Sequence, residues 1–173
     1  MFPLIVFISA LIHPSLAAGL AAPMAVMALL AYAPSLVFWT RRGSESDDGA
    51  VKLENPLELN AALRFGAFLA AVMLLGKLLA QSFGDQGVLW LAAISGVADL
   101  NAITLSVGRM SQQDLALTVA VLAITIAAAT NGLVKTAVSA VVGGRAIGLH
   151  VGLPLVTGSL AGLAVAWMAT PLW

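Results

Sequence analysis

The sequence predicts an all-α fold: a multi-pass transmembrane helical bundle of about six segments, one or two of them broken or kinked. Of the 173 residues, 61% are hydrophobic and 9% are charged, whereas a soluble domain typically carries about 25% charged residues. The mean hydropathy is +1.01. Several apolar runs reach the roughly 20 residues that a helix needs to cross a bilayer. We expect a single membrane domain over 1–173, with two N-terminal helices in 1–40, a hydrophilic loop in 41–55 and a four-helix core in 56–173.

Composition also excludes several classes of function. The formal net charge is zero, so no electrostatic attraction to nucleic acid is expected. The chain has no cysteine, and His13 and His150 are far apart in sequence, which argues against a metal site or a metal cofactor. Paired intramembrane aspartates and hydrolase motifs are absent from the sequence. We therefore expect neither an enzyme nor a bound cofactor.

The first 40 residues predict two helices. The run 2–18 is apolar but is interrupted at His13 and Pro14, and proline kinks or ends a helix. We place the turn at Ala22 and Pro23, with Pro23 starting the second helix. A cleaved signal peptide is the alternative for the first run, but no Lys or Arg precedes it, which favours a membrane helix.

The hydrophilic stretch and the helix after it come next. Residues 43–54 hold half of the chain's eight acidic residues and predict an exposed loop. Asn55, Pro56 and Glu58 form a strong helix start, and that helix is expected to end near Ser82. Its two cations, at positions 64 and 77, are close enough to the ends to reach the membrane surface.

Three apolar segments complete the chain. The first covers 88–107 and is long enough to cross the membrane, although a re-entrant path satisfies the positive-inside rule equally well. The second runs from about 111 to 142, about 46 Å if it is continuous, so we expect a break at Asn131–Gly132 and an end at Gly143–Gly144. The third covers 149–172. Its glycine pairs at a spacing of four are expected to allow close helix packing, more within the chain than in a dimer.

Polar residues inside two of these segments form the candidate site. An isolated charge at bilayer depth costs several kcal/mol and usually faces a partner or a cavity. We predict that Asp99 and Lys135 meet as a charge pair. A buried polar network that fixes helix packing is the alternative to a binding site or ion path. The six candidate residues are Ser95, Asp99, Asn101, Thr104, Asn131 and Lys135.

The same residues carry a family resemblance. The stretches 55–59, 84–85, 95–105 and 131–135 resemble the uncharacterised C-terminal membrane domain of bacterial proteins labelled MgtC/SapB family. In that family the domain usually follows an MgtC-like membrane half, whereas this chain begins inside the C-terminal domain. The resemblance implies a bacterial multi-pass membrane domain of unknown activity. It also raises the prospect of a separate partner chain.

Two functions from different classes follow. The first is a small-ion or small-solute transporter, or a channel-like protein, that uses the polar site around Asp99 and Lys135. The second is a non-catalytic accessory subunit of a larger membrane complex. For both we expect the bacterial cytoplasmic (inner) membrane as the location. The expected partners are the lipid bilayer and a homo-oligomer or a separate membrane chain.

Overall fold

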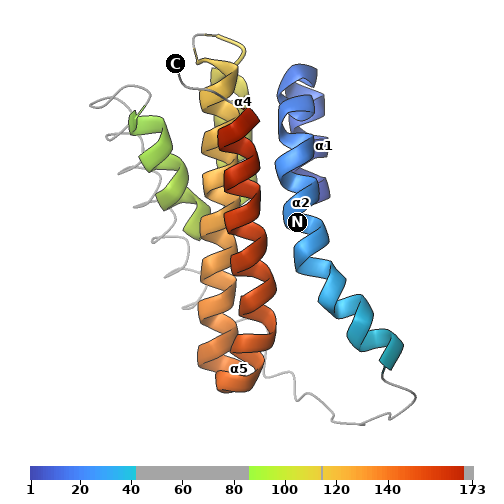
Figure 1. The fold of residues 1–173 in the computed structure, drawn as a ribbon. Helices are drawn as coiled ribbons and strands as arrows, with labels where there is room; N and C mark the ends of the chain where they lie inside the picture. The colour runs from blue at the N-terminus through green and yellow to red at the C-terminus, as the bar shows by residue number, and fades with distance from the viewer. Residues whose placement is uncertain (42–85, 114, 170–173) are drawn as a thin grey trace.

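The computed structural model describes residues 1–41, 86–113 and 115–169, and these residues form an all-helical bundle without strands (Figure 1). The all-α prediction is therefore confirmed. Within the described residues, three helical stretches are long and apolar enough to cross a membrane: Pro14–Pro34, Leu117–Ala140 and Ile147–Ala169. The predicted loop 43–54 and the helix expected from Asn55 to Ser82 lie outside the described residues.

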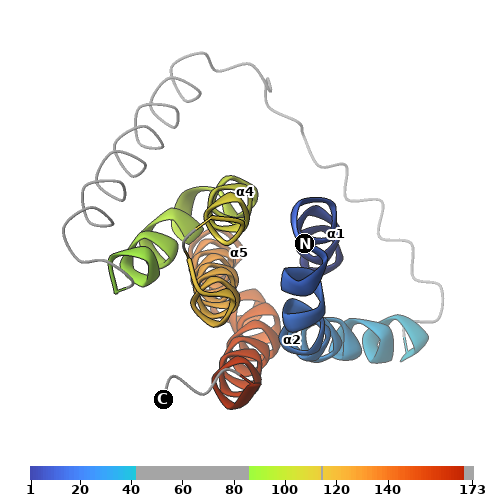
Figure 2. The same ribbon diagram turned by 90° about the horizontal axis from the view of Figure 1, so that it is seen from above.

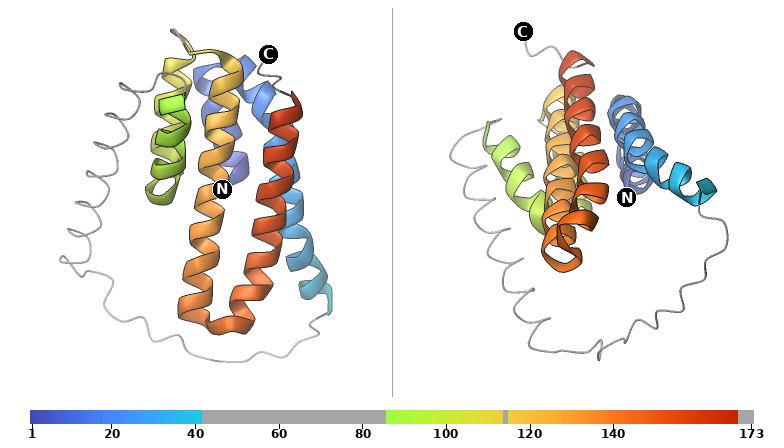
Figure 3. Two further views of the ribbon diagram at one scale, coloured as in Figure 1. Left: turned by 60° about the vertical axis from the view of Figure 1, so that its left-hand side comes forward. Right: turned by 60° about the horizontal axis from the view of Figure 1, so that its bottom comes forward.

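The longest element, α5, spans Leu117–Ala169 and folds back on itself at Gly144. Gly144 has φ 77°, a conformation that glycine adopts without the steric cost a side chain would impose. The two halves then lie side by side as a helical hairpin (Figure 3). The predicted end at Gly143–Gly144 is confirmed. The predicted break at Asn131–Gly132 is wrong, because α5 has helical geometry through these residues.

The first half of α5, Leu117–Ala140, is the central helix of the bundle. In its most apolar window, 61% of the residues are buried, against 33% for the span in α2 and 28% for the second half of α5. Its buried face is rich in alanine, and small side chains let neighbouring helices approach closely. The alanines of this face lie at 120, 123, 127, 128 and 129.

The N-terminal part forms a second hairpin of unequal arms. Helix α1, Phe2–Ile12, ends at His13, whose backbone is extended (φ −149°, ψ 102°). Helix α2 then spans Pro14–Arg41. Pro14 suits the first position of α2 because its missing N–H would lack an intrahelical partner there. The predicted turn at Ala22–Pro23 is wrong, since Pro23 lies inside α2 without ending it.

The segment predicted to cross the membrane at 88–107 instead forms a hairpin whose two arms start and finish at the same end of the bundle, and we call it the re-entrant hairpin. A helix over Gln86–Ala98 is followed by Asp99 in extended conformation (φ −150°, ψ 114°) and then by α4, Leu100–Met110. Gln86 and Val119 line one pocket, while Gly96 packs on Ala127. The first arm thus runs down the central helix, and α4 returns to the end from which it started (Figures 1 and 3).

Three short helices consequently stop in the middle of the bundle. Helices α1 and α4 have 11 residues each, about 16 Å, which is half of a hydrocarbon core of ~30 Å. The tip of the re-entrant hairpin lies against Ala127 and Asn131, near the middle of the central helix. We call this level mid-depth. We call the end that holds His13 and the loop after α4 the loop end; seen from it, α1 and α4 are neighbours (Figure 2).

Glycines in the second half of α5 make its contacts with the rest of the chain close. A Cβ on Gly148 would lie 2.6 Å from Ala140, and one on Gly152 would lie 2.6 Å from Thr136. Gly158 and Gly162 face Met27 of α2 in the same way. The small-residue pattern is therefore explained by packing within the chain, as the sequence indicated.

The re-entrant path makes a direct topological prediction. Single cysteines replacing the exposed residues Gln86 and Gln113 should react with a membrane-impermeant maleimide from the same side of the membrane. A cysteine replacing Arg145, beside the Gly144 turn, should react from the other side. Labelling of positions 86 and 113 from opposite sides would show that the segment between them crosses the membrane, as the sequence predicted.

The close approach at Gly96 predicts a strong effect of a single methyl group. A Cβ there would lie 2.4 Å from the carbonyl oxygen of Ala127, a backbone atom. Gly96→Ala should therefore destabilise the protein by about 1–3 kcal/mol, the usual cost of overpacking, measured by thermal unfolding in detergent. Gly108→Ala is the matched control. Its Cβ would meet side-chain atoms alone, of Ile12 at 3.1 Å and of Leu16 at 3.7 Å, and should cost less; an equal loss would contradict the assignment.

Candidate functional site

The break at Asp99 places a carboxylate at the start of α4. The backbone N–H of Asp99 donates to the carbonyl of Ser95 at 2.9 Å, which completes the last turn of the preceding helix. The Asp99 side chain then accepts a hydrogen bond from the backbone N–H of Asn101 at 2.8 Å. Aspartate is among the best N-cap residues, and its charge is stabilised by the positive end of the helix dipole. Asp99 is half-buried at mid-depth.

Asn131 joins the central helix to this break. Its side-chain amide donates to the carbonyl of Gly96 at 2.9 Å, across 35 residues of sequence. That carbonyl belongs to the last turn of a helix, where backbone acceptors have no intrahelical partner. The two polar groups noted in the sequence therefore meet, through an amide and a backbone carbonyl rather than through two charges.

Lys135 does not reach Asp99. Its Nζ lies 3.0 Å from the Sδ atom of Met1, at the start of α1, and the residue is exposed. In the described part of the chain, each of the two charged side chains has a different partner and neither is bonded to the other. The predicted charge pair is thus not formed in this structure.

The remaining predicted residues separate into different environments. Ser95 is buried, and its carbonyl holds the break, as described above. Asn101 is exposed and contributes its backbone N–H. Thr104 is fully buried, and its hydroxyl donates to the carbonyl of Leu100 at 2.7 Å. The side chains of Asn101 and Thr104 therefore do not face one common surface.

The groups around the break at mid-depth are the Asp99 carboxylate, the amides of Asn101 and Asn131 and backbone groups, with the Lys135 ammonium one turn along the helix from Asn131. No cluster of three or more His, Cys, Asp or Glu residues is present within residues 1–41, 86–113 and 115–169. Hard divalent cations take six or more oxygen ligands, which the described groups do not supply. The arrangement suits a proton, a monovalent cation or a small polar solute.

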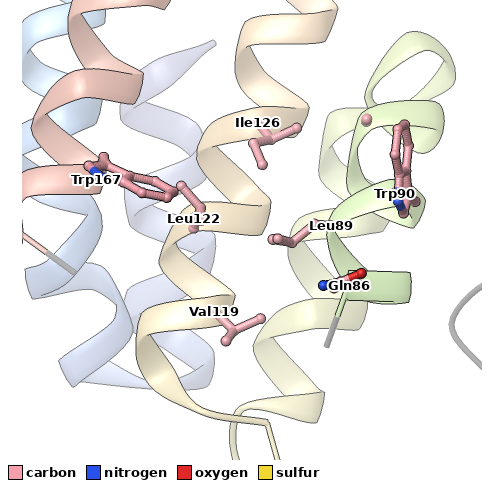
Figure 4. A pocket seen from close by; sticks show the side chains of 8 residues that line it. Gln86, Leu89, Trp90, Val119, Leu122, Ile126 and Trp167 are labelled. Carbon is pink, nitrogen blue, oxygen red and sulfur yellow. The ribbon is translucent and has the colours of Figure 1, made fainter. Parts of the chain in front are cut away.

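A separate pocket lies nearer the loop end, between the first arm of the re-entrant hairpin and α5. It has a volume of about 580 Å³ and is lined by apolar side chains together with Gln86 and the indoles of Trp90 and Trp167. Figure 4 shows these side chains converging from the Gln86–Ala98 helix and from both halves of α5. None of the six predicted site residues lines this pocket, so it is distinct from the polar site at mid-depth.

Two features of this region were missed from the sequence. The first is the helix break at Asp99; a signal for it was present, because Asp followed by an amphipathic run marks a helix start. The second feature is Ser9, a fully buried hydroxyl in α1. A single serine in an apolar run gives no sequence signal of its own.

The absence of a charge pair changes the expected outcome of a double-mutant cycle. Asp99→Asn and Lys135→Met should act independently, with an interaction energy within about 0.5 kcal/mol of zero, since distant sites without shared partners are additive. Thermal unfolding in detergent measures each loss. A double mutant markedly more stable than the sum predicts would show that the two charges do interact.

Comparison with known proteins identifies a family whose description names no activity. Residues 1–143 match the family described as Domain of unknown function (DUF4010). An uncharacterized protein of Aquifex aeolicus (strain VF5) is 27% identical over 117 residues, which is 66% of this chain. The aligned part spans about half, 51%, of that relative's length. Neither description mentions MgtC or SapB, so that wider resemblance stays a prediction. No solved structure is significantly similar.

Proposed function

The chain belongs to the DUF4010 family, and we propose that it is a small-ion transporter or channel-like protein of the bacterial cytoplasmic membrane. The observation that carries the proposal is the helix break at Asp99. A charged residue at mid-depth between two half-helices is energetically costly, and such residues in membrane segments usually mark a binding site or an ion path. Broken helices that present polar groups near the bilayer midplane recur in membrane transporters.

The depths of the short helices support this proposal. Among the described residues, α2 and the two halves of α5 continue past mid-depth, whereas α1 and both arms of the re-entrant hairpin do not (Figure 1). The polar groups at their ends need water, protein or a ligand around them, because lipid cannot satisfy backbone groups. An aqueous cavity reaching mid-depth from the opposite end would bring ions to Asp99.

The distribution of cations supports an orientation. Helix α2 ends at Arg41, and Arg145 follows the Gly144 turn at the same end, opposite the loop end (Figure 1). We assign the Arg41 and Arg145 end to the cytoplasm under the positive-inside rule. The loop end then faces the outside. The bacterial source of the similar Aquifex protein agrees with a bacterial membrane.

The variant Asp99→Asn removes the negative charge at the break and keeps the helix cap. Asparagine caps helices about as well as aspartate, so this variant should unfold near the wild-type temperature. Its ion flux in proteoliposomes should fall steeply, by about 10²–10⁴-fold if the carboxylate carries protons. Flux is measured with a pH-sensitive dye and with sodium- and potassium-loaded vesicles. Asp99→Ala is the matched control, because it loses the cap as well and should also lose about 1 kcal/mol of stability.

The accessory-subunit alternative is favoured by one observation. The similar Aquifex protein extends well beyond the aligned half, and a partner chain is another way to cover the ends of the three short helices. Purification from native membranes under mild detergent distinguishes the two functions. A stoichiometric larger complex, together with full tolerance of Asp99→Asn, would overturn the transport proposal.

A further inference from the structure

Two buried polar atoms, one in α1 and one at its C-cap, have no hydrogen-bond partner within residues 1–41, 86–113 and 115–169. They are the hydroxyl oxygen of Ser9 and Nδ1 of His13. Ser9 lies in the last turn of α1, and the backbone N–H of His13 donates to the carbonyl of Ser9 at 2.8 Å, which keeps the two residues close. Ser9 is 0% exposed. Buried polar groups are rarely left without a partner, and a bound water often supplies it.

The packing of α1 on α4 places a third polar group beside Ser9. A Cβ on Gly108 of α4 would lie 3.1 Å from Ile12 of α1, and both helices run from mid-depth towards the loop end (Figures 1 and 2). Ser9 is three residues before Ile12, and Thr104 is four before Gly108, so helix geometry puts them at one level of this seam. Both side chains are fully buried.

These groups have the capacity to hold water. Thr104 donates its hydroxyl proton to Leu100 and keeps lone pairs that can accept a hydrogen bond. The Ser9 hydroxyl and Nδ1 of His13 complete a set of three, and a buried water typically makes about three hydrogen bonds. The seam leads to the aqueous loop end, where the exposed Gln112 binds the carbonyl of Ile12.

We propose that water occupies the seam between α1 and α4 from His13 down to Ser9, forming the outer half of a proton path to Asp99. The proposal rests on the transport function above and names its substrate. Ile5 and Leu100 lie four residues before Ser9 and Thr104, and both belong with Ile103 to the buried apolar core. Helix geometry therefore places apolar side chains between Ser9 and mid-depth. An apolar layer of this kind admits a proton along a transient water chain but excludes a larger solute. The hydroxyls and imidazole of the seam carry no negative charge that would attract a metal cation.

Thiol accessibility tests the water directly, and the chain has no cysteine of its own. Ser9→Cys is nearly isosteric, and Thr104→Cys probes the same level from α4. The probe is silver ion, which is small and reaches thiols through water. It is added to membrane vesicles from the loop-end side, and the thiols left unreacted are counted with a maleimide after denaturation. Both variants should react about tenfold or more faster than Ile5→Cys, because the apolar layer at Ile5 holds no water.

The controls make each outcome decisive. Ile5 is 0% exposed, like Ser9, but lies one turn deeper, and Phe7 is 60% exposed on the outer surface of the bundle. Cysteines at both positions should stay slow. Ser9→Cys and Thr104→Cys as slow as Ile5→Cys would show a dry seam and overturn the proposal. Equal reaction at Ser9 and Ile5 would show general opening of the bundle and would also overturn it.

Ion flux separates this proposal from the transport function. In proteoliposomes, silver bound to Ser9→Cys should block the proton flux measured by a pH-sensitive dye and leave the silver-treated wild type unaffected. Transport of sodium or potassium without protons would reject the proton path and keep the transport function. A water-accessible Ser9→Cys with no flux of any ion would reject the transport function and the proton path together, leaving a hydrated seam.

Discussion

The structure depends on a helix that ends in the middle of the bundle, where side chains from two segments bind backbone groups at the break. In a bilayer core there is no water to satisfy exposed N–H and C=O groups, and each unpaired group costs several kcal/mol. At the break, side chains meet part of this requirement. The Asp99 carboxylate binds the N–H of Asn101, and the Asn131 amide binds the carbonyl of Gly96. The chain can therefore turn back at mid-depth, and the same turn exposes a carboxylate there.

The break and the core support each other through close packing. Because lipid is as apolar as leucine, helices in a membrane associate by van der Waals contact and by hydrogen bonds between segments. Gly96 provides both, since its missing side chain lets the helix rest on the backbone of Ala127 and its carbonyl accepts from Asn131. The alanine-rich face of the central helix makes this approach possible. A larger residue at either position would move the tip of the hairpin away from Asn131.

The sequence predicted the class of fold and the Gly144 turn because these depend on local properties. A high apolar content indicates that the chain lies in a bilayer. A pair of glycines indicates a backbone conformation that residues with side chains avoid. Four other predictions failed, the Asp99–Lys135 charge pair among them, because they depended on which neighbour a residue finds. Asn131 binds a different segment and so leaves its own helix intact. Pro14, rather than Pro23, follows the break in the first apolar run. The run 88–107 is long enough to cross, but Asp99 caps a new helix and reverses it.

Polar side chains in this bundle fall into two kinds, and the distinction bears on where function lies. In six cases a hydroxyl in an apolar helix donates to the carbonyl four residues earlier on its own helix; these residues are Thr104, Thr125, Thr130, Thr136, Ser139 and Thr157. Such a bond satisfies the donor within its own turn and says little about the residue's neighbours. Asn131 bonds outside its own helix, Asp99 starts a new one, and Ser9 has no partner among the described residues. Lys135 and Gln112 also bond to another segment, to Met1 and to Ile12. The polar groups that the helices do not satisfy by themselves therefore connect α1, α4 and the central helix, the elements between which the proton path is proposed.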